Sequence, residues 1–201
     1  MKFCNQCGEE VVYETPESDN RLRYICPSCD VIHYQNPNVV TGVLPLITDV
    51  DGIEKILLCK RAIEPRYGYW TLPAGFMENE ESLEEGAARE SIEEANLKLG
   101  ELKLYMVMSL PYISQVYMMF IGQAENDFSP GIESLETELF TESEIPWDQL
   151  AFPIVKKTLE CFFADRANLI NQNNESSELN RSLSNSQINN LPVHNIVYHK
   201  D

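Results

Sequence analysis

Three glutamates on one predicted helix have the spacing of ligands for a divalent metal ion. Ser82 is a good N-cap and Glu85 completes a capping box, so a helix is expected to begin directly after Ser82. Glu90 and Glu94 are four residues apart and Glu93 lies three from Glu90, which places all three carboxylates on one side of that helix. Carboxylates crowded in this way repel one another unless a cation lies between them. Such hard oxygen ligands suit Mg²⁺ or Mn²⁺ better than Zn²⁺.

A second candidate metal site lies near the N-terminus. Two C-x-x-C pairs, separated by 18 residues, contribute Cys4, Cys7, Cys26 and Cys29. This spacing is typical of a zinc site in which four thiolates bind one tetrahedral ion. So short a segment buries little apolar surface, and zinc binding would supply its folding free energy. The alternatives are a thioredoxin-like redox pair, which two matched pairs disfavour, and a DNA-binding ribbon, which an acidic residue balance disfavours. His33 is a fifth candidate ligand, expected just outside the site.

Charge and hydropathy narrow the class of protein. Fifteen basic residues against 32 acidic ones give a formal net charge of −17, which argues against nucleic-acid binding because such binding needs Lys and Arg at the phosphates. The same charge would repel a polyanionic small molecule, so bound metal would have to offset it locally. No apolar run approaches roughly 18 residues, so no membrane span is expected. Six cysteines without a visible signal peptide predict reduced thiols or metal ligands in a cytoplasmic protein.

The acidic helix and the loop before it resemble the Nudix box. That pattern reads Gly, five residues, Glu, seven residues, Arg-Glu, an apolar residue, any residue, Glu-Glu, any residue, Gly, then an apolar residue. The matching positions here are Gly75, Glu81, Arg89, Glu90, Glu93, Glu94 and Leu97. Ser91 replaces the apolar residue and Asn96 replaces the second Gly, but neither change touches a charged position. A solvated acidic helix would leave the Pro-Ala-Gly loop and Arg89 unexplained.

The resemblance implies a fold and a reaction. The four-cysteine ribbon followed by this box is similar to the zinc-ribbon Nudix group of ADP-ribose and FAD pyrophosphatases. It implies an α/β (α+β) protein, with a Nudix α/β/α sandwich around a mixed sheet, preceded by a small zinc-ribbon β module. The implied reaction is Mg²⁺-dependent hydrolysis of the pyrophosphate bond in a nucleoside diphosphate linked to another moiety. ADP-ribose, FAD and NADH all share the ADP half, and no motif distinguishes them.

The resemblance also implies roles for individual residues. Glu90, Glu93 and Glu94 would bind the catalytic metal together with the backbone carbonyl of Ala74, and Arg89 would pair with Glu81 to hold the loop against the helix. The general base is either a glutamate of the box or one from a later loop. The candidates on that loop are Glu133, Glu136 and Glu138.

Substrate contacts are less clearly marked in the sequence. Arg61 ends a predicted strand near the box, where it would contact substrate or else pair with Glu64. Tyr69 and Tyr117 are further candidates for substrate binding, and Trp70 would either stack on a nucleobase or lie in the core. The partner is expected to be a small-molecule nucleotide. The alternatives to an enzyme are a sensor that binds ADP-ribose without cleaving it, and a zinc-ribbon interaction protein.

The elements that must position these residues fall into three parts. A zinc ribbon is expected over residues 1–36, a Nudix domain over 37–168 and an Asn- and Ser-rich, flexible tail over 169–201. Strands are predicted over 39–48, 55–61, 102–110, 114–123 and 139–141, a helix over 153–169, and an acidic loop over 127–138. Residues 191–199 are more apolar than the rest of the tail and could form an edge strand. Edge pairing with a second copy would give a homodimer.

Overall fold

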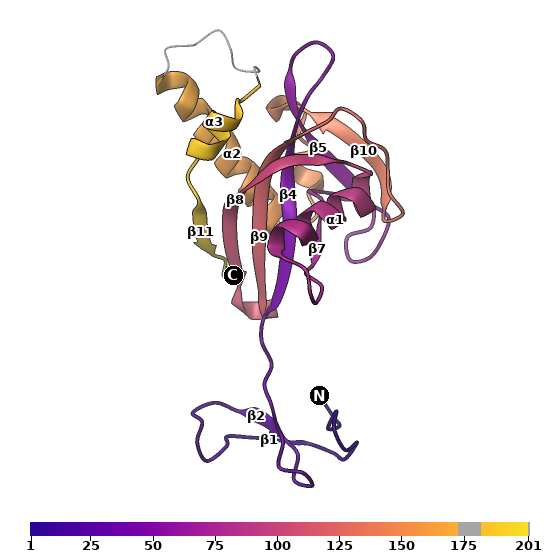
Figure 1. Ribbon diagram of the computed structural model, residues 1–201, viewed down its shortest axis with the longest axis vertical. Coiled ribbons are helices and arrows are strands. Elements are labelled where there is room, and N and C mark those ends of the chain that lie inside the picture. The colour runs from indigo at the N-terminus through magenta and orange to yellow at the C-terminus, as the bar shows by residue number, and fades with distance from the viewer. Residues whose placement is uncertain (173–181, 201) are drawn as a thin grey trace. The chain divides into compact units, whose positions relative to one another are not determined.

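The computed structural model describes residues 1–172 and 182–200, and the chain divides into two compact units, Met1–Pro37 and Asn38–Asp201 (Figure 1). The first unit contains a three-stranded antiparallel sheet in the order β1-β2-β3, formed by β1 (Val12–Glu14), β2 (Arg23–Ile25) and β3 (Ile32–His33). Tyr13 and Tyr24 pair across β1 and β2, and their ring centroids are 4.7 Å apart. Few side chains of this unit are buried, which agrees with a module that depends on bound metal for its stability.

The second unit is built on one mixed sheet in the order β10-β5-β4-β9-β8-β11, while β6 pairs with β5 and β7 with β4. Its strands are β4 (Asn38–Thr48), β5 (Glu54–Arg61), β6 (Trp70–Thr71), β7 (Ala74–Phe76), β8 (Leu99–Leu110), β9 (Gln115–Ala124), β10 (Ser134–Phe140) and β11 (His194–Val197). Its helices are α1 (Leu83–Ala95), η1 (Pro111–Ile113), η2 (Glu142–Glu144), η3 (Trp147–Gln149), α2 (Pro153–Gln172) and α3 (Asn185–Asn190). The β4–β9 and β8–β11 pairs are parallel and the others antiparallel.

The pleat of the sheet divides the apolar side chains between two cores. On β4, Val43 faces α1 and packs with Ala87 of that helix, whereas Leu44 belongs to the larger core on the other face. Leu159 and Phe162 of α2 are fully buried in that larger core. Helices therefore cover both faces of a mixed sheet, which confirms the predicted α/β/α sandwich. None of the helices within the described residues combines the length and apolar character needed to span a membrane.

The predicted loop over residues 127–138 is wrong in its second half, because strand β10 begins at Ser134. β10 pairs antiparallel with β5, from Ser134 opposite Arg61 to Phe140 opposite Ile56. It lies at one edge of the sheet, where charged side chains are common because one face and one edge meet solvent. Because this stretch contains several glutamates, its hydrophobicity did not predict the strand.

The predicted flexible tail also differs from the structure over its described part. Helix α2 continues to Gln172, and α3 and β11 follow. The side chains of Leu183, Ile188 and Leu191 are buried in the larger core, so a few well-spaced apolar residues outweigh the polar composition around them. The edge strand expected within residues 191–199 is present as β11, on this molecule and parallel to β8. Residues 173–181 and 201 lie outside the described residues.

Candidate active site and zinc site

Helix α1 carries the acidic cluster and is fastened at both ends. The Ser82 hydroxyl accepts from the Glu85 N–H at 3.2 Å and the Glu85 carboxylate accepts from the Ser82 N–H at 2.7 Å, so the predicted capping box is present. Asn96 adopts the left-handed conformation with φ 49°, and its amide donates to the Ser129 carbonyl at 3.2 Å. A glycine at this position would cap the helix but could not bind that loop. The buried Ser91 hydroxyl donates to a helix carbonyl at 2.8 Å. Both departures from the box therefore fit the fold.

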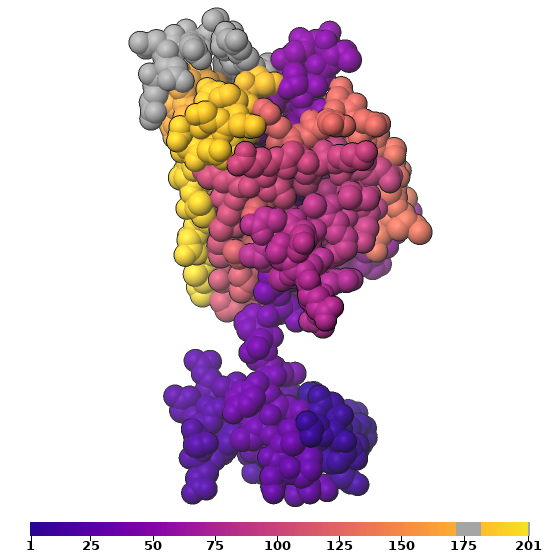
Figure 2. All heavy atoms as spheres, in the orientation of Figure 1, coloured from indigo at the N-terminus to yellow at the C-terminus, as the bar shows by residue number. Residues whose placement is uncertain are grey.

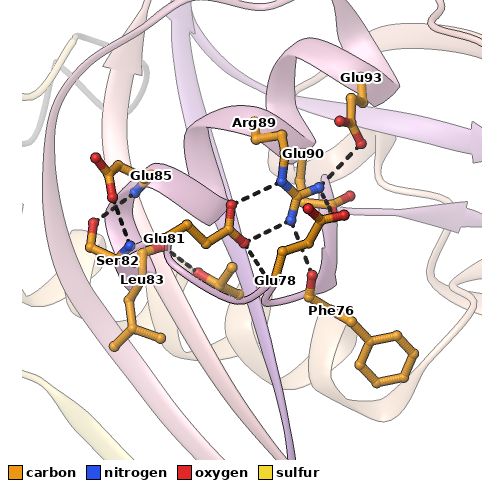
Figure 3. A network of polar contacts seen from close by, with 10 residues as sticks. Phe76, Glu78, Glu81, Ser82, Leu83, Glu85, Arg89, Glu90 and Glu93 are labelled. Atoms are coloured by element: carbon orange, nitrogen blue, oxygen red, sulfur yellow. Dashed lines mark hydrogen bonds and ion pairs between the residues drawn. The ribbon is translucent and has the colours of Figure 1, made fainter.

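Arg89 connects the loop before α1 to the acidic face of the helix (Figure 3). Its guanidinium donates twice to the Glu81 carboxylate, at 3.0 and 2.9 Å, and once to the Phe76 carbonyl at 3.0 Å. The same group donates to Glu90 at 2.6 Å and to Glu93 at 3.2 Å. The paired guanidinium lowers the pKa of Glu81 to about 2. Arg89 thus fixes the direction of two of the three clustered carboxylates as well as the loop.

Glu94 is the most enclosed carboxylate of the cluster. Its residue is 4% exposed, and its Oε2 atom has no hydrogen-bond partner within the described residues. Burial raises the pKa of Glu94 to about 8, and the nearby Glu90 carboxylate adds to this rise, while the positive charge of Arg61 opposes it. A buried carboxylate oxygen without a partner is costly unless a proton or a cation occupies its place.

Strand β7 passes close to the acidic cluster. A Cβ atom at Gly75 would lie only 2.2 Å from the Glu90 carboxylate, so a side chain at this position would displace either the strand or the glutamate. Ala74, the preceding residue, lines the same cavity as Glu90 and donates its N–H to Glu94. The glycine of the box therefore leaves room for the Glu90 carboxylate beside the backbone of β7.

The clustered carboxylates line a cavity of about 590 Å³. This volume lies in the usual range for sites that bind small molecules, about 300–1,000 Å³. One part of the lining is acidic, and the glutamates of the lining are Glu64, Glu78, Glu90, Glu93, Glu94 and Glu133. Another part is mainly apolar and includes Ile63, Leu110, Tyr112, Ile113, Tyr117 and Phe152. The cavity therefore suits a molecule with a charged part and a ring-bearing part.

Two of the three predicted substrate-contact residues line the cavity. Arg61 lines the cavity, with its guanidinium 5.1 Å from the Phe152 ring centroid, and forms no ion pair with Glu64 among the described residues. Tyr117 also lines the cavity. Tyr69 does not line it, and the Arg66 guanidinium lies over its ring instead.

The structure also decides where Trp70 and the three candidate general bases lie. Trp70 is buried against Phe140, with ring centroids 5.1 Å apart, which is the core position that the sequence left open. Among the three loop glutamates, Glu133 lines the cavity. Glu136 lies on β10 and pairs with Lys60 at 2.9 Å, and Glu138 is exposed on the same strand, outside the cavity lining. Geometry therefore favours Glu133 over the other two.

Sequence reasoning missed several cavity residues, among them Glu78, Tyr112, Ile113, Gln115 and Phe152. One signal could have found Tyr112 and Ile113, because they form the short connection between two strands that the sequence did predict. Phe152 directly precedes α2, and no local pattern marks it as a cavity residue. Its position depends on how α2 packs on the sheet.

The four cysteines of the first unit lie together. Their Sγ atoms are all within 4.8 Å of one another, with 3.7 Å between Cys4 and Cys29 and 3.4 Å between Cys7 and Cys26. A tetrahedral zinc ion with Zn–S bonds of about 2.3 Å requires sulfur separations of roughly 3.8 Å, so the set fits that ion. His33 is buried beside this group, and its contact helps to lower the pKa of Cys4, after the larger effect of backbone N–H groups.

The two cysteine turns have the same backbone geometry. The Cys4 N–H donates to the carbonyl five residues later at 2.8 Å, and the Cys26 N–H does the same at 3.0 Å. In each turn the residue four positions after the first cysteine, Gly8 or Asp30, has a positive φ and donates to that cysteine's carbonyl. The repeated turn directs both thiols of each pair to one point.

This fold and these two sites define the class of protein. Residues 2–35 match the family described as Nudix N-terminal, a zinc ribbon, and residues 38–163 match the NUDIX domain family. The chain belongs to the Nudix family. It is also similar over the full length of both chains to a NUDIX hydrolase from Nitrosomonas europaea, with 47% sequence identity and a TM-score of 0.81.

Curated relatives share less of the sequence. The chain is 26% identical over 151 residues to the NAD-capped RNA hydrolase NudC of Vibrio vulnificus, which covers 73% of this chain and 53% of that protein. It is 28% identical over 162 residues to the NudC of Deinococcus radiodurans, covering 79% and 55%. The chain therefore spans about half the length of the curated relatives it matches.

Proposed function

We propose that this Nudix protein hydrolyses the pyrophosphate bond of a nucleoside diphosphate linked to another moiety, in the class of ADP-ribose, FAD and NADH. The observation that carries the proposal is the carboxylate cluster on α1, placed in the lining of a cavity that also has an apolar, aromatic part. A diphosphate at the carboxylates would leave the apolar part of the cavity for a ring of the substrate.

The donor set fits a hard divalent cation. Glu90, Glu93 and Glu94, with the carbonyl of Ala74, would hold Mg²⁺ or Mn²⁺, since carboxylate and carbonyl oxygens suit these ions. The buried Glu94 oxygen without a partner is the atom that most needs such an ion. When bound, the ion would neutralise charge on the phosphates and increase the acidity of a bound water molecule.

The chain's own residues supply the rest of the site. Arg89 holds Glu81, Glu90 and Glu93 in fixed directions and so acts as a positioning residue. The Arg61 side chain at the cavity provides a positive charge that can attract a phosphate oxygen. Glu133 is our proposed general base among the loop glutamates, because it is the member of that set at the cavity.

The first unit would hold zinc in a structural role. Cys4, Cys7, Cys26 and Cys29 form a closed set of four sulfur ligands, which leaves no position for substrate. Four-cysteine sites of this kind stabilise a fold and do not perform chemistry.

The names of the curated relatives bear on the range of substrates. The NudC proteins are named as NAD-capped RNA hydrolases. A net charge of −17 disfavours extended contacts with an RNA backbone, but it does not exclude an RNA whose capping dinucleotide alone enters the cavity. The prediction that nucleic acid is not a partner is therefore limited to sequence-independent binding along the strand. Dinucleotides of the NAD type are among the substrates we propose.

A substrate panel tests the proposal. Purified protein is incubated with ADP-ribose, NADH, FAD and an NAD-capped oligonucleotide, with and without Mg²⁺, and the products are separated by chromatography. Cleavage of the pyrophosphate bond should release AMP, or a 5′-phosphorylated RNA, only when the metal is present. Tight binding of ADP-ribose without turnover of any member would support the alternative of a non-catalytic sensor.

A further inference from the structure

The end of the chain returns to the sheet beside the cavity. β11 runs parallel to β8, with His194 opposite Met106 and Val197 opposite Ser109. The Tyr198 N–H extends this pairing by donating to the Ser109 carbonyl at 2.9 Å. Figure 2 shows the C-terminal residues as a yellow band along this edge of the unit. Tyr198 therefore lies at the end of β8, where the connection η1 begins.

Polar contacts fix the position of this segment. His194 Nε2 lies 2.8 Å from an Asp165 oxygen on α2, and the Tyr105 hydroxyl of β8 donates to the same oxygen at 2.7 Å. The Lys103 ammonium, also on β8, donates to several carbonyls at the end of α3, including that of Asn189 at 2.8 Å. Since these partners come from β8 and α2, the register of β11 on the sheet is set by elements of the main fold.

The pleat of β11 determines which side chains face the core. His194 and Ile196 are half-buried and Val197 is exposed, and the same alternation makes Tyr198 half-buried. Ile196 and Tyr198 pack against the core cluster that contains Leu110. Leu110 also lines the cavity. Tyr198 is therefore on the face of the sheet where the cavity lies.

Tyr198 contacts a residue of the cavity wall. Its ring centroid is 6.3 Å from that of Tyr112, and the two ring planes are inclined by 52°. Tyr112 lies in η1 and lines the cavity, yet it is 44% exposed, so few neighbours restrict its side chain. Tyr198 is not among the residues that line the cavity. Its contact with substrate would be indirect, through Tyr112.

We propose that Tyr198 is a positioning residue for substrate, which holds the Tyr112 ring as the surface on which a planar ring of the nucleotide substrate packs. This inference deepens the proposed function and rests on it. β7 adjoins the carboxylates and pairs with β4, and β9 lies between β4 and β8 in the sheet. Because η1 connects β8 to β9, it borders the cavity away from the acidic cluster. A diphosphate bound at the carboxylates would place the ring-bearing part toward Tyr112. Tyr198 therefore acts on substrate binding and not on bond cleavage.

Steady-state kinetics of Tyr198→Ala test this inference with the best substrate of the panel. We expect KM to rise about two- to tenfold, the range of one lost aromatic contact, while kcat stays within twofold of wild type. Tyr198→Phe keeps the ring and should restore the wild-type KM. Val197→Ala, at the neighbouring exposed position, is the matched control and should leave both constants unchanged.

A double-mutant cycle separates positioning from general loss of stability. In a Tyr112→Ala background, Tyr198→Ala should produce no further rise in KM, because the wall that it positions is already gone. The dissociation constant of ADP-ribose, measured by calorimetry with Ca²⁺ in place of Mg²⁺, gives a second readout that does not need turnover. It should rise in Tyr198→Ala by the same factor as KM.

The outcomes distinguish this inference from the proposed function. An active wild type with an unchanged KM in Tyr198→Ala overturns the inference alone, as does a fall in kcat at constant KM. Full additivity of the two substitutions also overturns it. If the wild type cleaves no substrate, the proposed function fails, and calorimetry then decides the inference. Weaker binding of ADP-ribose to Tyr198→Ala than to wild type supports the inference, and equal binding overturns it.

Discussion

At the scale of single residues, Glu94 shows how the position proposed for a metal ligand opposes stability. The sequence predicted its role from its place in the box, four residues after Glu90, but gave no measure of its burial. The structure buries Glu94 and Glu90 and leaves Glu93 half-exposed. Burial could not be predicted from helix spacing, because it depends on β7 and the loop around Glu133, which cover the helix after folding. The pairing of Arg89 with Glu81, by contrast, followed from the resemblance alone and is present.

The raised pKa of Glu94 predicts a pH dependence of stability in the metal-free protein. The folded pKa, about 8, exceeds the ordinary value of 4.5, so the folded state binds more protons between these values. This contribution to stability is complete below about pH 4.5 and is lost as pH rises toward 8, at a cost on the order of a few kcal/mol. Urea denaturation from pH 5 to pH 8, on protein dialysed free of Mg²⁺ with its zinc retained, should show this decline.

Two substitutions identify the group responsible. Glu94→Gln should flatten the profile and raise stability at pH 8, because it removes the buried charge. Glu84→Gln changes an exposed carboxylate on the same helix and should keep the wild-type slope. A profile that is flat in the wild type, or equally steep in Glu94→Gln, would show that Glu94 is not the titrating group.

At the scale of elements, hydrophobic pattern predicted the central strands well and the edges poorly. β4, β5 and β9 carry long apolar runs because both of their faces are covered, and such runs are visible in the sequence. β10 carries glutamates at the solvent-facing edge, and β11 is surrounded by polar residues. The first part of β10 was obscured because edge strands need few apolar residues, whereas the apolar character of residues 191–199 did indicate β11. The C-terminal segment joins the core through Leu183, Ile188 and Leu191.

Leu183 provides the test that this segment belongs to the fold. Its side chain is buried, and its N–H donates at 2.8 Å to Glu54, which pairs with Arg166 on α2. Leu183→Ala should cost about 2–5 kcal/mol, which corresponds to a melting temperature lower by about 5–15 °C. Ser186→Ala, at an exposed position of α3, is the control and should change little. Equal melting temperatures for wild type and Leu183→Ala would mean that the tail does not pack as described.

At the scale of the whole molecule, the chain combines two units with different sources of stability. The second has an extensive apolar core, whereas the first has few buried side chains and four clustered thiols. The cysteine spacing alone predicted that the four thiols lie together, because the two turns are local structures. The cavity could not be predicted in the same way, since its lining comes from α1, β7, η1 and the start of α2, which are distant in sequence.

Zinc content tests the account of the first unit. Protein purified without chelator should contain one zinc per chain, retained through dialysis that removes Mg²⁺, because four thiolates bind zinc more tightly than carboxylates bind magnesium. Cys26→Ser should lose the ion. Cys161→Ser, which changes a cysteine outside the ribbon, should retain it. Elemental analysis that finds no zinc in the wild type, or equal zinc in Cys26→Ser, would refute the site.

The most direct measurement is the Mg²⁺ dependence of turnover for wild type, Glu94→Gln and Glu84→Gln, with the best substrate of the panel. Loss of partners that merely orient a metal ligand typically costs about 10–100-fold, and loss of a ligand itself should cost at least as much. We therefore predict that Glu94→Gln loses at least that factor in kcat at saturating Mg²⁺, without any loss of thermal stability, while Glu84→Gln matches the wild type. Wild-type turnover in Glu94→Gln would contradict the account.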